Sequence, residues 1–189
     1  MNTIFIIVSS ILALISPVIY VKAILKGEAK PHRTTRLVLL LITSLATLSL
    51  FVQHDTVAIW LAGISTLQSI VIFVLSIKHG MGGFSKMDIV CFFIAFGGIV
   101  LWQTTKNPSL ALYASILADF VGMVPALVKT YKYPETEIWT FYALDTTAAL
   151  FSLLAVKTYA LQQFSYPLYL MVINFSMVVL ALRYLKNKR

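Results

Sequence analysis

Long apolar runs alternate with short polar segments along the whole chain. Seven runs approach the roughly 20 residues that a helix needs to cross about 30 Å of hydrocarbon, because each helical residue rises about 1.5 Å. The seven runs are Ile4–Ile24, Leu37–Val52, Thr56–Ile77, Ile89–Gln103, Leu110–Val128, Ile138–Val156 and Tyr166–Leu182. They predict helices, since a helix satisfies its backbone hydrogen bonds within one segment in lipid. The second and fourth runs are short, and we expect their helices to extend into flanking residues.

Composition places the chain among integral membrane proteins. Apolar residues make up 59% of it and charged residues only 12%, whereas soluble domains carry about a quarter charged residues. The net charge of +8 does not indicate nucleic-acid binding, because no basic face interleaves with aromatic residues. The first apolar run lacks a basic leading region and is too long for the core of a signal peptide, so we interpret it as a membrane span.

The positions of Lys and Arg between the runs predict the orientation of the chain. Thirteen of them fall on one side of the predicted membrane and two, Lys106 and Lys157, on the other. The thirteen are Lys22, Lys26, Lys30, Arg33, Arg36, Lys78, Lys86, Lys129, Lys132, Arg183, Lys186, Lys188 and Arg189. Basic loops stay in the cytoplasm. This bias fits an odd number of spans. We therefore expect a protein of the plasma membrane, with its N-terminus outside the cell and its C-terminus in the cytoplasm.

An internal repeat relates the first three predicted spans to the last three. Two connections share a Lys-x4-Pro element, from Lys26 to Pro31 and from Lys129 to Pro134. The prolines of these elements are 103 positions apart, whereas Pro17 and Pro125 inside the preceding runs are 108 apart, so the first repeat carries about five extra residues. Chance similarity of apolar helices is the competing explanation. The repeat predicts one all-α membrane domain with parallel halves: residues 1–79, a linker helix within 80–107, and residues 108–189.

This 3+1+3 layout resembles the SWEET and PQ-loop superfamily of small seven-helix membrane transporters. The resemblance rests on Pro17-Val-Ile-Tyr20 leading to Lys26, and on Pro125 leading into Lys129-Thr-Tyr-Lys132. It implies transport of a small metabolite such as a sugar, by alternating access between two three-helix bundles. Val18 and Ala126 follow the prolines instead of glutamine, which leaves the subfamily and the substrate open. A ligand-sensing receptor on the same fold is the alternative.

Polar residues in the middle of the predicted spans are the candidates for a binding site. Asp119 and Asp145 lie near the centres of the fifth and sixth runs, where a carboxylate costs roughly 2.5–3.5 kcal/mol on insertion scales. Gln68, Ser69 and Asn174 lie near the same depth, and Ser69 and Asn174 are equivalent under a repeat offset of 105. Transporters built from repeats place their substrate site at the midplane. Hydrogen bonds between helices are the competing interpretation of Gln68 and Asn174.

Helical spacing adds two aromatic residues and two prolines to these candidates. Trp139 and Tyr142 precede Asp145 by six and three residues, so the three share a face of the sixth helix. Trp139 also suits the membrane interface. Pro17 and Pro125 are candidate hinges, or kinks that the helices tolerate. Because no Lys or Arg lies near mid-depth, the pattern favours a neutral or cationic substrate over an anionic one.

Other kinds of chemistry lack support in the sequence. The Gly-x-Gly-Asp motif of intramembrane aspartyl proteases is absent, because Ala118 precedes Asp119 and Leu144 precedes Asp145, so we expect no enzyme. Cys91 is the only cysteine and the three histidines are scattered, so we predict no metal or cofactor. Desolvation favours the neutral form of a carboxyl group, which makes proton coupling a hypothesis. The sequence leaves open whether the chain forms a homo-oligomer, because the spacing around Gly97-Gly98 is not the dimer pattern.

Overall fold

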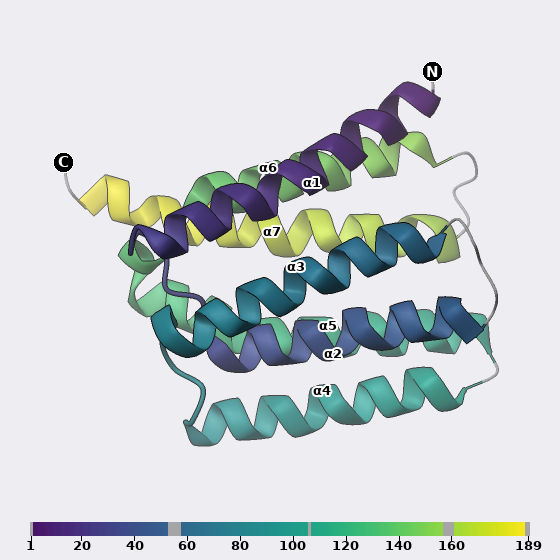
Figure 1. Cartoon of the computed structure of the whole chain (residues 1–189), viewed down its shortest axis with the longest axis horizontal. Coiled ribbons are helices and arrows are strands. Elements are labelled where there is room, and N and C mark those ends of the chain that lie inside the picture. Colours follow the sequence, from purple (N-terminus) through teal and green to yellow (C-terminus); the bar gives the residue numbers. More distant parts are fainter. Residues whose placement is uncertain (1, 53–57, 106, 157–160, 188–189) are drawn as a thin grey trace. The chain divides into compact units, whose positions relative to one another are not determined.

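A computed structural model describes residues 2–52, 58–105, 107–156 and 161–187 of the chain. In this part the chain forms seven α-helices and one short 3-10 helix, η1. The elements are α1 (Asn2–Leu25), α2 (Arg33–Val52), α3 (Ala58–His79), α4 (Lys86–Thr104), α5 (Pro108–Lys132), η1 (Pro134–Thr136), α6 (Trp139–Ala155) and α7 (Leu161–Asn187). Each α-helix coincides with most of one predicted apolar run (Figure 1), and Thr56 and Val57 of the third run lie outside the described residues. The all-α fold is therefore confirmed.

The polar residues between the runs determine where the helices begin. Helix α2 starts at Arg33 and α4 at Lys86, so both short runs do extend into flanking residues, as expected. Ser85 caps α4: its hydroxyl oxygen accepts a hydrogen bond from the amide of Asp88, and the Asp88 carboxylate accepts one from the amide of Ser85. Asn107 caps α5, because its side-chain oxygen accepts from the amides of Ser109 and Leu110. Such caps satisfy amides that have no partner within a helix.

Within the described residues, four helices are long and apolar enough to cross a membrane. Their apolar stretches are Ile4–Leu25, Lys86–Thr104, Ser109–Lys132 and Phe164–Arg183. Helix α3 contributes a shorter apolar stretch, Gly63–His79, and α6 has only 17 residues. On α1, large side chains such as Ile4, Ile11 and Val18 are at least half exposed. Exposed apolar surface of this extent is what a lipid-facing helix presents. The chain therefore has the character of a membrane protein.

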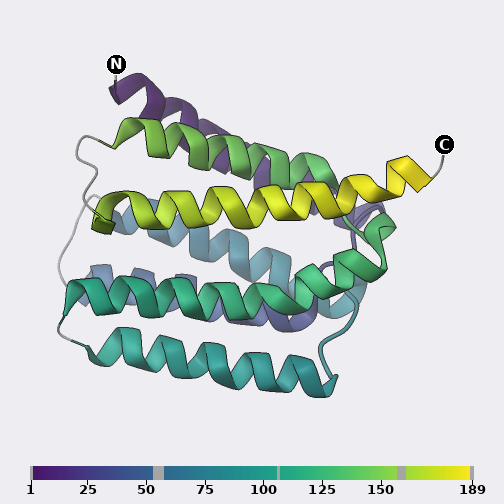
Figure 2. The ribbon, with the colours of Figure 1, turned by 180° about the vertical axis from the view of Figure 1, so that it is seen from behind.

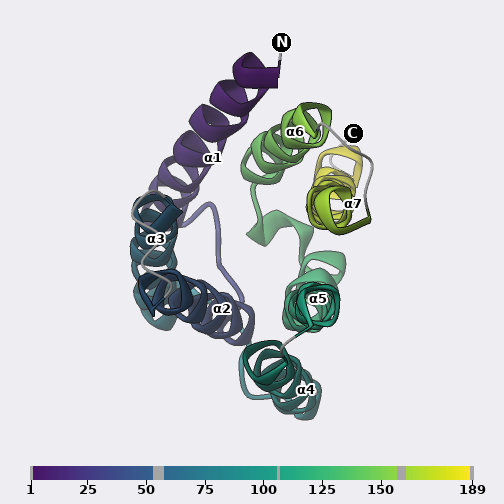
Figure 3. The ribbon, with the colours of Figure 1, turned by 90° about the vertical axis from the view of Figure 1, so that its right-hand side faces the viewer.

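The first compact unit of the structure combines the two ends of the chain, Met1–Ala29 and Leu127–Arg189. Helix α6 packs against both α1 and α7, and η1 packs against α7. Figure 1 shows α1 and α6 running side by side, and Figure 3 shows α6 beside α7. Ser9 on α1 donates a hydrogen bond to the carbonyl of Ala148 on α6, at 2.8 Å. This unit contains the cavity described below.

The second compact unit is the continuous segment Lys30–Ala126. Within it α2 packs against α3 and α4, and the first part of α5 lies beside α4 (Figure 2). Glycine allows close approach at two places. A Cβ atom at Gly98 would lie 3.1 Å from that of Ala118, and one at Gly122 would lie 2.5 Å from a methyl group of Val38. Small residues at such contacts are typical of helix packing in membranes.

The compact units do not follow the boundaries of the predicted repeat. The first unit joins α1 to α6 and α7, while the second contains α2, α3, α4 and most of α5. Helix α5 passes from one unit to the other after Ala126, one residue beyond Pro125. The repeat is a similarity of sequence, and the 3+1+3 arrangement stays a prediction.

Candidate functional site

The first unit contains a cavity of about 270 Å³ between α1, α6 and α7. Its lining residues are Ser9, Ala13, Asp145, Ala148, Ala149, Ser152, Tyr166, Pro167, Leu170 and Asn174. Tyr166 is 38% exposed and Ala13 is also exposed, so the cavity is accessible from outside the unit. Three alanines leave the space that larger side chains would fill. The rest of the lining mixes hydroxyl, amide and carboxylate groups with apolar carbon, as ligand sites do.

Asp145 is held in place by a contact with α1. The hydroxyl of Ser16 donates a hydrogen bond to the carboxylate of Asp145 at 2.5 Å, and Ser16 is fully buried. Hydrogen bonds to a carboxylate are short and strong. The residue after Ser16 is Pro17, which has no amide hydrogen and cannot donate the helical hydrogen bond to the carbonyl of Ala13. Ala13 lines the cavity, and its backbone oxygen therefore lacks its helical donor.

Asn174 enters the cavity from the middle of α7. Its side-chain nitrogen donates to the carbonyl of Leu170 at 2.9 Å, one turn earlier on the same helix. This bond is within the helix, so it does not tie α7 to a neighbour. The structure therefore brings together Asp145 and Asn174, two of the residues that the sequence predicts for a binding site.

The other predicted site residues are not among the lining residues of this cavity. Trp139 begins α6 and is 43% exposed, while Tyr142 is buried with its ring centroid 6.3 Å from that of Tyr20. Neither is among the lining residues of the cavity.

Gln68 and Ser69 on α3 and the buried Asp119 on α5 belong to the second unit. Pro17 is in the first unit, and Pro125 is a buried residue of α5 in the second.

No protein-family model, curated protein or solved structure matches the chain significantly. The resemblance to the SWEET and PQ-loop superfamily therefore stays a prediction.

A buried ion pair that the sequence did not suggest lies in the first unit. The ammonium of Lys129 contacts the carboxylate of Glu137 at 2.5 Å, and the hydroxyl of Tyr20 donates to the same carboxylate at 2.9 and 3.1 Å. All three side chains are at least 90% buried, and the ring of Phe141 stacks on Tyr20 at 4.2 Å. We call Tyr20, Lys129 and Glu137 the tyrosine triad. Lys129 is thus a structural cation and not only an orientation signal.

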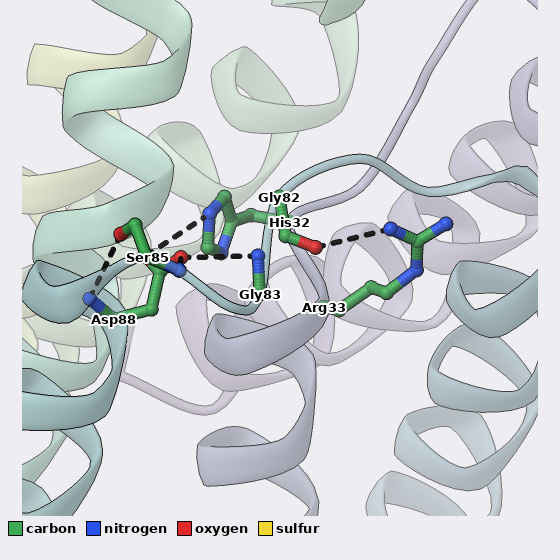
Figure 4. Close-up of polar contacts among 6 residues, drawn as sticks. All are labelled: His32, Arg33, Gly82, Gly83, Ser85 and Asp88. Atoms are coloured by element: carbon green, nitrogen blue, oxygen red, sulfur yellow. Dashed lines mark hydrogen bonds and ion pairs between the residues drawn. The ribbon is translucent and has the colours of Figure 1, made fainter.

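A second polar cluster joins two loops in the second unit (Figure 4). The His32 ring lies 3.4 Å from the Asp88 carboxylate, which also accepts hydrogen bonds from the amides of Gly83 and Ser85. Arg33 donates to the carbonyl of Gly82 at 3.0 Å. We call this cluster the loop junction. Its one visible signal in the sequence is Ser85-x-x-Asp88, a spacing typical of a capping box.

Proposed function

We propose that the protein is a membrane transporter that binds a small neutral or cationic polar metabolite in the cavity of the first unit. The observation that carries the proposal is the meeting of Asp145 and Asn174 in one accessible cavity, with Ser9 of α1. A carboxylate in an apolar helix is costly unless it faces a cavity or a partner. Asp145 does both, since Ser16 holds it and the cavity reaches it.

The predicted topology indicates on which side of the membrane the cavity lies. With the N-terminus outside, Ser9 near the start of α1, Ser152 near the end of α6 and Tyr166 near the start of α7 all fall in the outer half of the membrane. The tyrosine triad falls toward the cytoplasmic end of the same unit. We propose seven crossings in the plasma membrane, with a solute that enters the cavity from outside. Alternating access, with Pro17 and Pro125 as hinges, then carries the solute across.

The proposed relation to the SWEET and PQ-loop superfamily rests on the repeat and on the layout of the helices. It favours a transporter, with a sugar as one candidate substrate and proton coupling through Asp119 or Asp145 as a further hypothesis. A receptor that binds the solute without moving it is the alternative, and a homo-oligomer is compatible with either.

Measuring solute flux in proteoliposomes tests the proposal that the protein is a transporter. Solute counterflow should be measured with and without a pH gradient, for the unaltered chain and for Asp145→Asn and Asn174→Ala. We expect each substitution to lower the uptake rate at least tenfold, since Asp145→Asn removes the charge of the carboxylate and Asn174→Ala removes a hydrogen-bonding amide from the cavity. Ser176→Ala is the matched control, because Ser176 is not among the lining residues of the cavity and its hydroxyl donates to the carbonyl of Val172 within the same helix.

The outcomes separate the alternatives. Saturable binding without flux selects the receptor, and normal flux in both cavity variants contradicts the proposed site. Uptake that ignores the pH gradient contradicts proton coupling while leaving transport intact.

A further inference from the structure

We propose that the first turns of α4 bind an anionic phospholipid of the cytoplasmic leaflet. The site belongs to the second unit and involves none of the residues that line the cavity between α1, α6 and α7. The inference rests on the proposed topology, which puts the connection between α3 and α4 on the cytoplasmic side of the membrane. It does not depend on transport.

A cavity of about 190 Å³ lies between α2 and α4, near the start of both helices. Its lining residues are Thr34, Leu37, Gly83, Asp88, Ile89, Phe92 and Phe93. Phe93 is 65% exposed and Ile89 is 50% exposed, so the apolar wall of the cavity is open to the surroundings of α4. Around a helix that crosses a membrane, those surroundings are lipid chains.

A lysine stands at the cytoplasmic end of this apolar wall. Ile89 and Phe93 follow Lys86 by three and seven residues, so the three residues share one face of α4. Phe93 lies about 10 Å beyond Lys86 along the helix axis, because each residue rises about 1.5 Å. The Lys86 side chain is exposed. A phosphate group at Lys86 therefore leaves an acyl chain free to run past Ile89 to Phe93.

A buried hydroxyl group lies at the headgroup end of the cavity. Thr34 is the second residue of α2 and is only 6% exposed. Its Oγ1 atom lies 3.7 Å from the position that a Cβ atom would take at Gly83, so it faces the loop before α4. Within the described residues this hydroxyl makes no hydrogen bond. A buried hydroxyl without a partner is costly, and the oxygens of a phospholipid headgroup supply one.

The acidic residue of this lining is engaged by the protein and is almost fully buried. Oδ2 of Asp88 accepts hydrogen bonds from the amides of Gly83 and Ser85, at 3.1 and 2.9 Å. Oδ1 lies 3.4 Å from Nε2 of His32 (Figure 4). Asp88 is only 2% exposed, whereas Lys86 is exposed. The charge that the site presents to its surroundings is therefore positive, and it attracts an anion.

Phe84 indicates the depth of the site in the membrane. Its side chain is 86% exposed, although the amides of its neighbours Gly83 and Ser85 are fixed by the Asp88 carboxylate. A large apolar side chain on a fixed loop beside a lysine is typical of the membrane interface, where the ring enters the boundary between headgroups and acyl chains. Lys86 then lies at the level of the lipid phosphates.

A second copy of the chain is the competing occupant of this face. Copies in one membrane share their orientation, and the predicted cytoplasmic side carries thirteen of the fifteen Lys and Arg residues. A second copy would therefore bring further cations towards Lys86. An anionic phospholipid instead offers a phosphate for Lys86 and an acyl chain for the apolar wall, in the order in which α4 presents them.

Native mass spectrometry of the full chain released from detergent micelles measures lipid binding. The chain should be titrated with phosphatidylglycerol and with phosphatidylcholine of the same acyl chains, and soluble glycerol phosphate should be added as a competitor. We expect the first phosphatidylglycerol to bind about fivefold more tightly than the first phosphatidylcholine, which is the contribution of one lysine near an anionic surface. Glycerol phosphate should not displace it, because it has no acyl chain for the apolar wall.

Lys86→Gln should abolish the preference for phosphatidylglycerol, and Lys86→Arg should keep it, because arginine keeps the charge. Lys26→Gln is the matched control, since it makes the same charge change at an exposed residue of the first unit, on the same predicted side of the membrane. The preference should survive in this control.

Phe93→Ala should weaken the binding of both lipids about threefold, because it removes part of the apolar wall. Ile94→Ala is its matched control: Ile94 is 50% exposed on α4 and is not among the lining residues of the cavity.

Equal affinities for the two lipids, a preference that survives Lys86→Gln, or equal losses in Lys86→Gln and Lys26→Gln overturn the inference. Displacement by glycerol phosphate also overturns it, because the headgroup alone is then the ligand. If Phe93→Ala changes the oligomeric state and leaves lipid binding intact, the face belongs to a second copy. Binding is measured without flux, so a failed transport assay leaves the lipid site standing, and a failed lipid preference leaves the transporter standing.

Discussion

At the scale of single residues, acidic side chains that lie in apolar surroundings have polar or oppositely charged partners. Asp145 has Ser16, and Glu137 has both Lys129 and Tyr20. When two ions are buried, the free energy of solvation that they lose is about as large as the free energy of their mutual attraction. A buried ion pair is therefore weak evidence for stability. Removing one member alone is different, because the other then remains buried with its charge uncompensated.

The tyrosine triad provides the prediction at this scale. Glu137→Leu should lower the free energy of unfolding by about 3–5 kcal/mol, because Lys129 stays buried without its carboxylate. The double variant Lys129→Met with Glu137→Leu should recover most of that loss, and Tyr20→Phe should cost about 1–3 kcal/mol. Titration of the purified protein with dodecyl sulfate in mixed micelles measures these changes. A double variant as unstable as Glu137→Leu contradicts the ion pair.

At the scale of elements, the two loops that meet at the loop junction are held together by specific contacts. Within the loop junction the amide of Met81 donates to the carbonyl of Pro31 at 3.1 Å. Gly82 has a φ of +72°, and a Cβ atom there would lie 2.3 Å from Nε2 of His32. Gly80 is equally confined, because its Cβ would lie 2.3 Å from the carbonyl oxygen of Ser76 and 2.5 Å from that of Pro31. Backbone atoms cannot move aside as the end of a flexible side chain can.

Gly80→Ala is therefore expected to lower the free energy of unfolding by about 1–3 kcal/mol, the typical cost of forcing extra atoms into a packed site. Gly97→Ala on α4 is the matched control, since its Cβ would meet nothing within 4 Å. Alanine is the better helix former, so this control should be neutral or gain up to about 1 kcal/mol. Dodecyl sulfate titration measures both, and equal stability of the two variants contradicts the tight packing at Gly80.

At the scale of the whole molecule, apolar surface and loop charge together argue for a chain that crosses the bilayer repeatedly. In the part of the chain that the structure describes, four helices are long and apolar enough to span it. The predicted seven crossings put the connection after α1 in the cytoplasm and the connection after α4 outside, because α2, α3 and α4 separate them. The residues Glu28 and Thr104 report on these two connections, and both are exposed.

Cysteine labelling measures that topology. In a Cys91→Ala background, we expect a membrane-impermeant maleimide to label Thr104→Cys in intact cells. Glu28→Cys should react only after permeabilisation, because the basic loops stay in the cytoplasm. The opposite pattern reverses the orientation, and labelling of both positions in intact cells contradicts an odd number of crossings between them.

What the sequence by itself determined is local. The seven helices follow from apolar runs, because a helix satisfies its backbone within one segment and needs no information from distant residues. The candidate site was only partly predictable. The sequence pointed to Asp145 and Asn174, but it grouped with them Asp119, Gln68 and Ser69, which belong to another compact unit.

Only the tertiary structure decided which helix faces meet. It placed Asp145 and Asn174 around one cavity, put Ser16 against Asp145, and buried Lys129 against Glu137. Lipid is as apolar as leucine, so the hydrophobic pattern of a span does not select its neighbours. The neighbours of a span are selected instead by close contacts between small residues and by a few polar groups. Such contacts join positions that are far apart in the chain.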